Sequence, residues 1–132
     1  MKYKENKMKY GLLALATLIP FTALASDSTL NESLKPWQPL SIERTESNIT
    51  IVMDEMKVTD VMLSAVAENG VCMPLWLNKE ASYLEGIKEV SILNKFKRQG
   101  YVLEEPLSTC KAIGEATGNT GKIILLGHTR MF

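Results

Sequence analysis

The chain has 132 residues, 45% of them hydrophobic, and its 15 basic side chains balance 15 acidic ones. That length suits one small domain, and a chain without net positive charge lacks the basic field that holds a phosphate backbone, so we expect no nucleic-acid partner. With two cysteines, one histidine and no repeat, we also expect no catalytic residue, no metal site and no cofactor.

Residues 1–25 have the three parts of a secretory signal peptide. Four lysines precede a charge-free apolar run that begins at Gly11, and the run closes in the small-x-small pattern Ala23-Leu24-Ala25. A run of about 15 residues is shorter than the roughly 20 residues of a membrane span. We predict cleavage after Ala25 and export to a bacterial periplasm or to the medium. A membrane anchor is the alternative.

Removal of that segment changes the charge balance of the protein. The segment holds four of the basic residues and one of the acidic ones, so 11 basic and 14 acidic residues remain. The mature chain is therefore mildly acidic, which strengthens the case against nucleic acid. Since the remainder holds no second long apolar run, we expect the mature form not to be embedded in a membrane.

The first mature residues are polar and rich in turn-forming side chains. We expect residues 26–40 to form a loose segment that ends where Trp37, between two prolines, docks on the protein's own core or serves as a peptide-like binding element. Residues 41–132 then form a single globular domain.

Residues 48–53 alternate and are β-branched, as is typical of a strand. Thr59 or Asp60 is suited to cap a helix that carries Val61 to Val66 at helical spacing, and Asn69-Gly70 is a stop signal for that helix. The apolar run 71–77 fits either a buried strand or a second helical piece.

Residues 79–98 are predicted as the longest helix, because apolar side chains recur at helical intervals from Tyr83 to Phe96. Three cations near its end oppose the negative pole of the helix, and Gly100 follows as a terminator. This placement explains the basic cluster without a ligand.

The last third of the chain gives four further expectations. Residues 101–103 are a short extended piece, and Pro106 favours a helix over 107–117. Residues 118–121 are a turn, and 122–126 a buried strand that pairs with 48–53. The fold class expected is α+β, with two or three helices and a short sheet. A mainly helical domain is the alternative.

Cys72 and Cys110 are the only cysteines. In an oxidising compartment an isolated pair favours a disulfide, which here closes a loop worth about 4 kcal/mol. Free thiols, redox chemistry and zinc binding are alternatives, but the pair is too far apart for a Cys-x-x-Cys motif and a zinc site needs four ligands.

Three motifs suggest chemistry only at first sight. Residues 114–122 resemble a phosphate-binding loop, but Ala116 and Ile123 replace its first glycine and its metal-binding hydroxyl. His128 is a candidate base for a serine hydrolase, but the sequence has no Gly-x-Ser-x-Gly motif to supply the nucleophile. Methionines with His128 suit Cu(I), yet most of them lie at expected core positions, where methionine fills gaps.

These exclusions leave binding as the expected activity. We expect a small exported protein that binds another protein, most simply an inhibitor or immunity protein that neutralises a toxin or an enzyme. An accessory component of a secretion, conjugation or pilus system is one alternative, and a small-ligand or copper binder is another. The candidate partner-binding residues are two tryptophans and two acidic pairs, namely Trp37, Trp76, Asp54, Glu55, Glu104 and Glu105.

Overall fold

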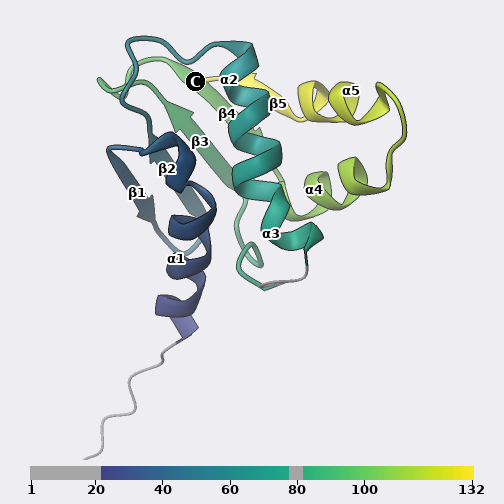
Figure 1. Cartoon of the computed structure of the whole chain (residues 1–132), viewed down its shortest axis with the longest axis horizontal. Helices are drawn as coiled ribbons and strands as arrows, with labels where there is room; N and C mark the ends of the chain where they lie inside the picture. The colour runs from purple at the N-terminus through teal and green to yellow at the C-terminus, as the bar shows by residue number, and fades with distance from the viewer. Residues whose placement is uncertain (1–21, 78–81) are drawn as a thin grey trace, which may run out of the picture.

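A five-stranded sheet forms the back of the molecule in the computed structural model, which describes residues 22–77 and 82–132 (Figure 1). The strands lie in chain order across the sheet, and every neighbouring pair is antiparallel except β2 and β3, which are parallel. The strands are β1 (Ser41–Arg44), β2 (Asn48–Val52), β3 (Glu89–Leu93), β4 (Gly100–Glu104) and β5 (Thr129–Met131).

The parallel pair requires a crossover, because β2 and β3 run in the same direction. The crossover contains α2 (Asp60–Ala65), the π-helical segment η2 (Val66–Cys72) and α3 (Met73–Trp76), which follow one another without a break. The remaining helices are α1 (Thr22–Ser33), the 3₁₀ turn η1 (Lys35–Trp37), α4 (Pro106–Glu115) and α5 (Thr120–Gly127). This architecture confirms the α+β class, and a disulfide joins Cys72 to Cys110 as predicted.

The core lies between the sheet and the helices in front of it (Figure 1). Alternate strand residues face the helices and are fully buried, as Ile49 and Ile51 of β2 and Val90 and Ile92 of β3 are. The other sheet face carries Thr50, which lies opposite Ser91 in the register. The helical layer therefore covers one face of the sheet.

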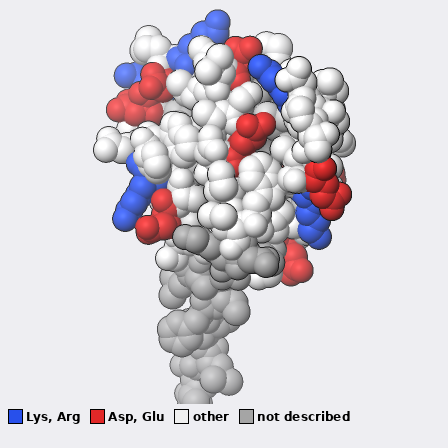
Figure 2. Space-filling model, turned by 45° about the vertical axis from the view of Figure 1, so that its right-hand side comes forward, with Lys and Arg blue, Asp and Glu red and all other residues white. Residues whose placement is uncertain are grey.

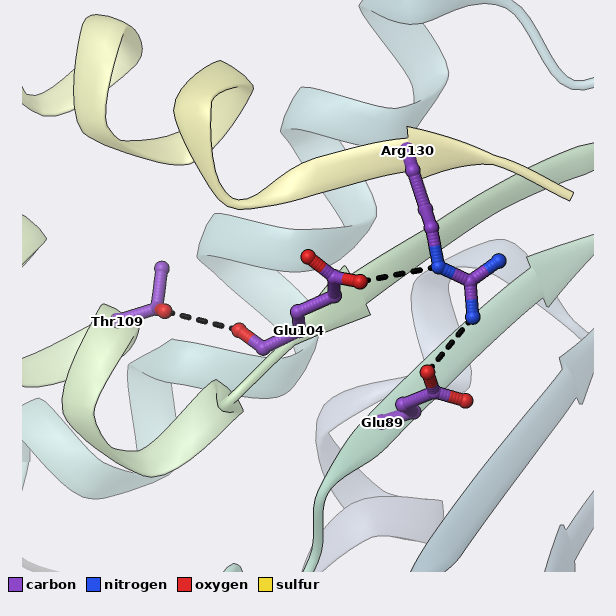
Figure 3. Close-up of polar contacts among 4 residues, drawn as sticks. All are labelled: Glu89, Glu104, Thr109 and Arg130. Carbon is purple, nitrogen blue, oxygen red and sulfur yellow. Dashed lines mark hydrogen bonds and ion pairs between the residues drawn. The ribbon is translucent and has the colours of Figure 1, made fainter.

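Arg130 of β5 bridges two carboxylates on the sheet face that carries Thr50 and Ser91 (Figure 3). Its Nε donates to Glu104 Oε2 at 3.0 Å and its Nη2 to Glu89 Oε2 at 2.6 Å, and these bonds to Glu89 and then Glu104 raise the pKa of Arg130 above its usual range. Glu89 and Glu104 are direct cross-strand partners, and Thr109 Oγ1 donates to the backbone oxygen of Glu104 at 2.9 Å. The short edge strand β5 is thus tied to β4 and β3.

The expectation of a loose segment over 26–40 is wrong for most of its length. α1 extends to Ser33, and Leu30 and Leu34 are buried in the core with 1% and 0% of their surface exposed. Their spacing of four residues places both on one helix face, which packs against η2. The predicted signal peptide lies largely outside the described residues, and its predicted cleavage point falls within α1.

The predicted helix over 79–98 is also wrong where the structure describes it. Residues 82–86 form turns, with Gly86 at a φ of 80°, and β3 follows. The apolar spacing that suggested a helix combines buried turn residues, Tyr83 and Leu84, with the alternating side chains of a strand. Residues 79–81 of the predicted range lie outside the described part of the chain.

The strand predicted over 122–126 is helical, because these residues form most of α5. β2 consequently pairs with β1 and β3, and the predicted pairing of 48–53 with 122–126 is wrong. Predictions for β2, for an extended piece within β4 and for a helix opened by Pro106 are confirmed. So is the cap of α2, where Thr59 Oγ1 accepts a hydrogen bond from the Met62 N–H at 3.2 Å.

The stop predicted at Asn69-Gly70 is wrong, and the undecided run 71–77 is helical as far as Trp76. Contacts from outside the helix stabilise its wider π turn. Ser33 Oγ donates to the Gly70 carbonyl oxygen at 2.6 Å, and the buried Tyr83 hydroxyl donates to the Val71 carbonyl oxygen. In residues 22–77 and 82–132, no helix is long and apolar enough to cross a bilayer.

Candidate functional site

One face of the crossover helix looks toward α4. Ser64, Glu68, Cys72 and Trp76 recur at intervals of four residues, so they lie close to one line along α2, η2 and α3. The disulfide between Cys72 and Cys110 fixes this face against α4, with a Cα–Cα distance of 5.2 Å. Side chains before and after Cys72 on this line therefore border the space between the two helices.

Trp76 forms the wall of that space. Its Nε1 donates to the Cys110 carbonyl oxygen at 2.7 Å, and the indole packs over α4 at Gly114. A Cβ atom on Gly114 would lie 2.6 Å from Trp76 Nε1, so only glycine lets the indole lie this close to α4. The ring is half-buried, and both contacts with α4 are made by the edge that carries its N–H group.

The space opens into a hollow of about 440 Å³ between the crossover helix and the α4–α5 connection. The α4–α5 side comes from the stretch that resembles a phosphate loop. The stretch begins in the last turn of α4, where a phosphate loop would begin after a strand, and it turns at Gly118 and Asn119 before α5 begins. The lining residues are Ser64, Glu68, Trp76, Ile113, Ala116, Gly118, Asn119, Gly121 and Lys122.

Glu68 and Lys122 are the charged residues of the lining. Glu68 is half-buried, Lys122 is exposed, and neither makes an ion pair within the described part of the chain. Figure 2 shows the side on which α4 and α5 come forward. Charged side chains gather toward its margins, and much of its middle is neither acidic nor basic apart from an acidic group near the centre.

Large apolar side chains stand exposed on the elements that border the hollow. Val61 lies one turn before Ser64 on α2 and is 74% exposed, and Leu77 follows Trp76. Ile123 and Leu126 lie on the outer side of α5, with exposures of 68% and 47%. The hollow thus lies within a surface that has unpartnered apolar side chains on both of its helical borders.

Of the six residues predicted to bind a partner, Trp76 alone lines this hollow. Trp37 ends η1 and packs half-buried against the core. Asp54 and Glu55 follow the end of β2, whereas Glu104 lies opposite Glu89 at the start of β3. Because β2 and β3 are parallel, the two acidic pairs lie at opposite ends of the sheet, and they do not form one acidic rim.

Sequence reasoning missed Ser64, Glu68 and Lys122. The signal for Ser64 and Glu68 was the four-residue spacing that they share with Cys72 and Trp76, and the helix stop predicted at Asn69-Gly70 concealed it. Lys122 was assigned to a strand.

Elsewhere His128 is exposed at the end of α5, and Met131, three residues later, is 75% exposed. Met53 lies in the core with 2% exposure. Within residues 22–77 and 82–132, no three His, Cys, Asp or Glu side chains are placed to hold a metal ion together.

Comparisons of the chain with known protein families, with characterised proteins and with solved structures found no significant match.

Proposed function

We propose that this protein is an exported inhibitor or immunity protein, which acts by binding another protein through the face around Trp76. One observation carries the proposal. A face with few charges in its middle presents exposed apolar side chains on both sides of a hollow with a rigid aromatic wall. Clustered apolar exposure rimmed by polar groups is typical of protein-binding surfaces, and buried aromatic anchors dominate their energetics.

A photoactivatable cross-linking residue at Ile123 tests this surface in the native host. The expected result is one discrete adduct, which is lost when Leu126→Asp is added. The matched control places the same residue at Glu46, which is exposed in the β1–β2 turn at the far edge of the sheet. No adduct at Ile123, or equal adducts at both positions, would contradict the proposal.

The identity of the adduct then separates an inhibitor from an accessory protein. An inhibitor at equimolar ratio suppresses the enzymatic or toxic activity of the cross-linked partner, and the Leu126→Asp variant does so less well. An accessory component instead co-purifies with a secretion, conjugation or pilus assembly and leaves its activity intact, which would contradict the inhibitor assignment.

Export is part of the same proposal, and the mass of the protein measures it. Protein recovered from the periplasmic extract or the medium should begin at Ser26. Intact, membrane-bound protein that retains residues 1–25 would favour an anchor.

A further inference from the structure

We propose that the hollow beside Trp76 receives an arginine side chain of the partner protein, with Glu68 as its counter-ion. This inference rests on the proposed function and assigns the chemistry that the partner must present.

The first argument is the charge of Glu68. This carboxylate is half-buried in the hollow and makes no ion pair within the described part of the chain. A partner that covers this face removes water from Glu68, and a carboxylate buried without a counter-charge is strongly unfavourable. Lys122 lines the same hollow but is exposed and makes no ion pair with Glu68, so we assign the counter-charge to a cationic group of the partner.

The second argument is the aromatic wall. The hydrogen bond from Trp76 Nε1 to the Cys110 carbonyl oxygen and the close contact at Gly114 hold the indole in place. The methylene stem of an arginine side chain packs along an aromatic ring, and its planar guanidinium donates two parallel hydrogen bonds to a carboxylate beyond that ring. Lysine has a compact point charge and lacks the planar fork, so arginine fits this pair of groups better.

Lys122 is the other charged group of the lining, and its position is compatible with an arginine guest. It lies in the first turn of α5 and is exposed, so its ammonium group remains in water. Its charge opposes a cationic guest weakly through solvent. Lys122→Gln is therefore expected to strengthen the binding of a cation, whereas Glu68→Gln weakens it.

N-acetyl-arginine amide serves as the probe, because it presents the side chain without a partner protein. Titration is followed by the indole N–H resonance of Trp76, which Trp37→Phe distinguishes from the second indole. We expect a saturable shift with a dissociation constant in the millimolar range, about 1–10 mM. N-acetyl-citrulline amide has the same shape without the charge, and it should bind about tenfold more weakly or not at all.

The variants complete the test. Glu68→Gln should weaken the arginine probe about tenfold, and Lys122→Gln should strengthen it by about twofold. Unchanged chemical-shift dispersion in both variants establishes that they are folded. The proposal is overturned by equal binding of citrulline, by arginine binding that survives Glu68→Gln, or by no saturable shift up to about 50 mM.

The outcome is separable from that of the cross-linking experiment. A partner captured at Ile123 together with no arginine binding leaves the protein-binding face in place and removes the arginine assignment. Arginine binding without any adduct at Ile123 keeps the chemistry assigned to the hollow and removes the protein-binding face.

Discussion

The indole nitrogen of Trp76 lies 2.7 Å from the carbonyl oxygen of Cys110, the residue whose sulfur is bonded to Cys72. Cys72 and Trp76 are four residues apart, so two adjacent turns of one helix are attached to the same residue of α4. One attachment is covalent and the other a hydrogen bond. The wall of the hollow and the disulfide are therefore parts of one joint between the crossover helix and α4.

The disulfide should contribute a large share of the stability. Replacing both cysteines by alanine opens a loop of 38 residues and is expected to lower the free energy of unfolding by about 4 kcal/mol. Denaturant titration of the double variant measures the loss. The wild-type protein under reducing conditions is the control and should show a similar loss. A change below about 1 kcal/mol would contradict the structural role.

Gly114 should be intolerant of a methyl group although it lies inside a helix. Gly114→Ala places a Cβ against Trp76 Nε1 and forces the indole from its hydrogen bond, at an expected cost of about 1–3 kcal/mol. Gly127→Ala is the control, because a Cβ there has no neighbour within 4 Å. It should leave stability unchanged or raise it by up to about 1 kcal/mol. Equal melting temperatures for the two variants would be inconsistent with a tight joint.

The sequence predicted the elements that rest on local chemistry. Thr59 caps α2 because its hydroxyl accepts from a nearby N–H, and Pro106 opens α4 because a first-turn residue needs no N–H partner. The β-branched run likewise predicted the strand β2, and the isolated cysteine pair predicted the disulfide. These signals act over a few residues or through one covalent bond.

The errors arose where burial decides and local pattern does not. The four apolar residues over 123–126 fit a buried strand or a buried helix equally well, and here they lie in α5, with Leu125 packed into the core. Gly70 would end an isolated helix, but here Leu34 packs so tightly against it that a Cβ would lie 2.5 Å from Leu34 Cδ2. These choices depend on neighbours distant in sequence, as does the hollow that the uninterrupted helix forms.

The two ion pairs of Arg130 should stabilise the protein mainly by offsetting the repulsion between Glu89 and Glu104. Arg130→Gln leaves Glu89 and Glu104 as direct cross-strand neighbours of like charge, so the melting temperature should fall at neutral pH and low salt. Adding Glu104→Gln should restore part of the loss, and higher salt should reduce it.

A matched control for this bridge is Lys97→Gln. It breaks the exposed ion pair with Glu43 but leaves no like-charge pair facing each other across adjacent strands. Its melting temperature should therefore change less. An equal fall for Arg130→Gln and Lys97→Gln would show that repulsion between Glu89 and Glu104 plays no part.

Tyr83 should make the protein sensitive to alkali. Burial raises the pKa of Tyr83 well above its usual value, an effect that the charge of nearby Arg44 reduces in part, and the hydroxyl donates to the Val71 carbonyl oxygen. The folded state therefore holds the phenol neutral, whereas the unfolded chain ionises near pH 10. The stability due to this difference is complete below that pH and is lost as the pH rises above it, by about 1.4 kcal/mol per unit.

Tyr83→Phe isolates this effect because it keeps the ring and removes the titrating group. At pH 7 the variant should be about 1 kcal/mol less stable, since the Val71 carbonyl loses its partner. Between about pH 10 and 12 its free energy of unfolding should fall less steeply than that of the wild type, so the two curves converge. Denaturant titrations across that range measure both curves. Parallel curves would mean that Tyr83 ionises in the folded protein as readily as in the unfolded chain, which its burial beneath the π turn opposes.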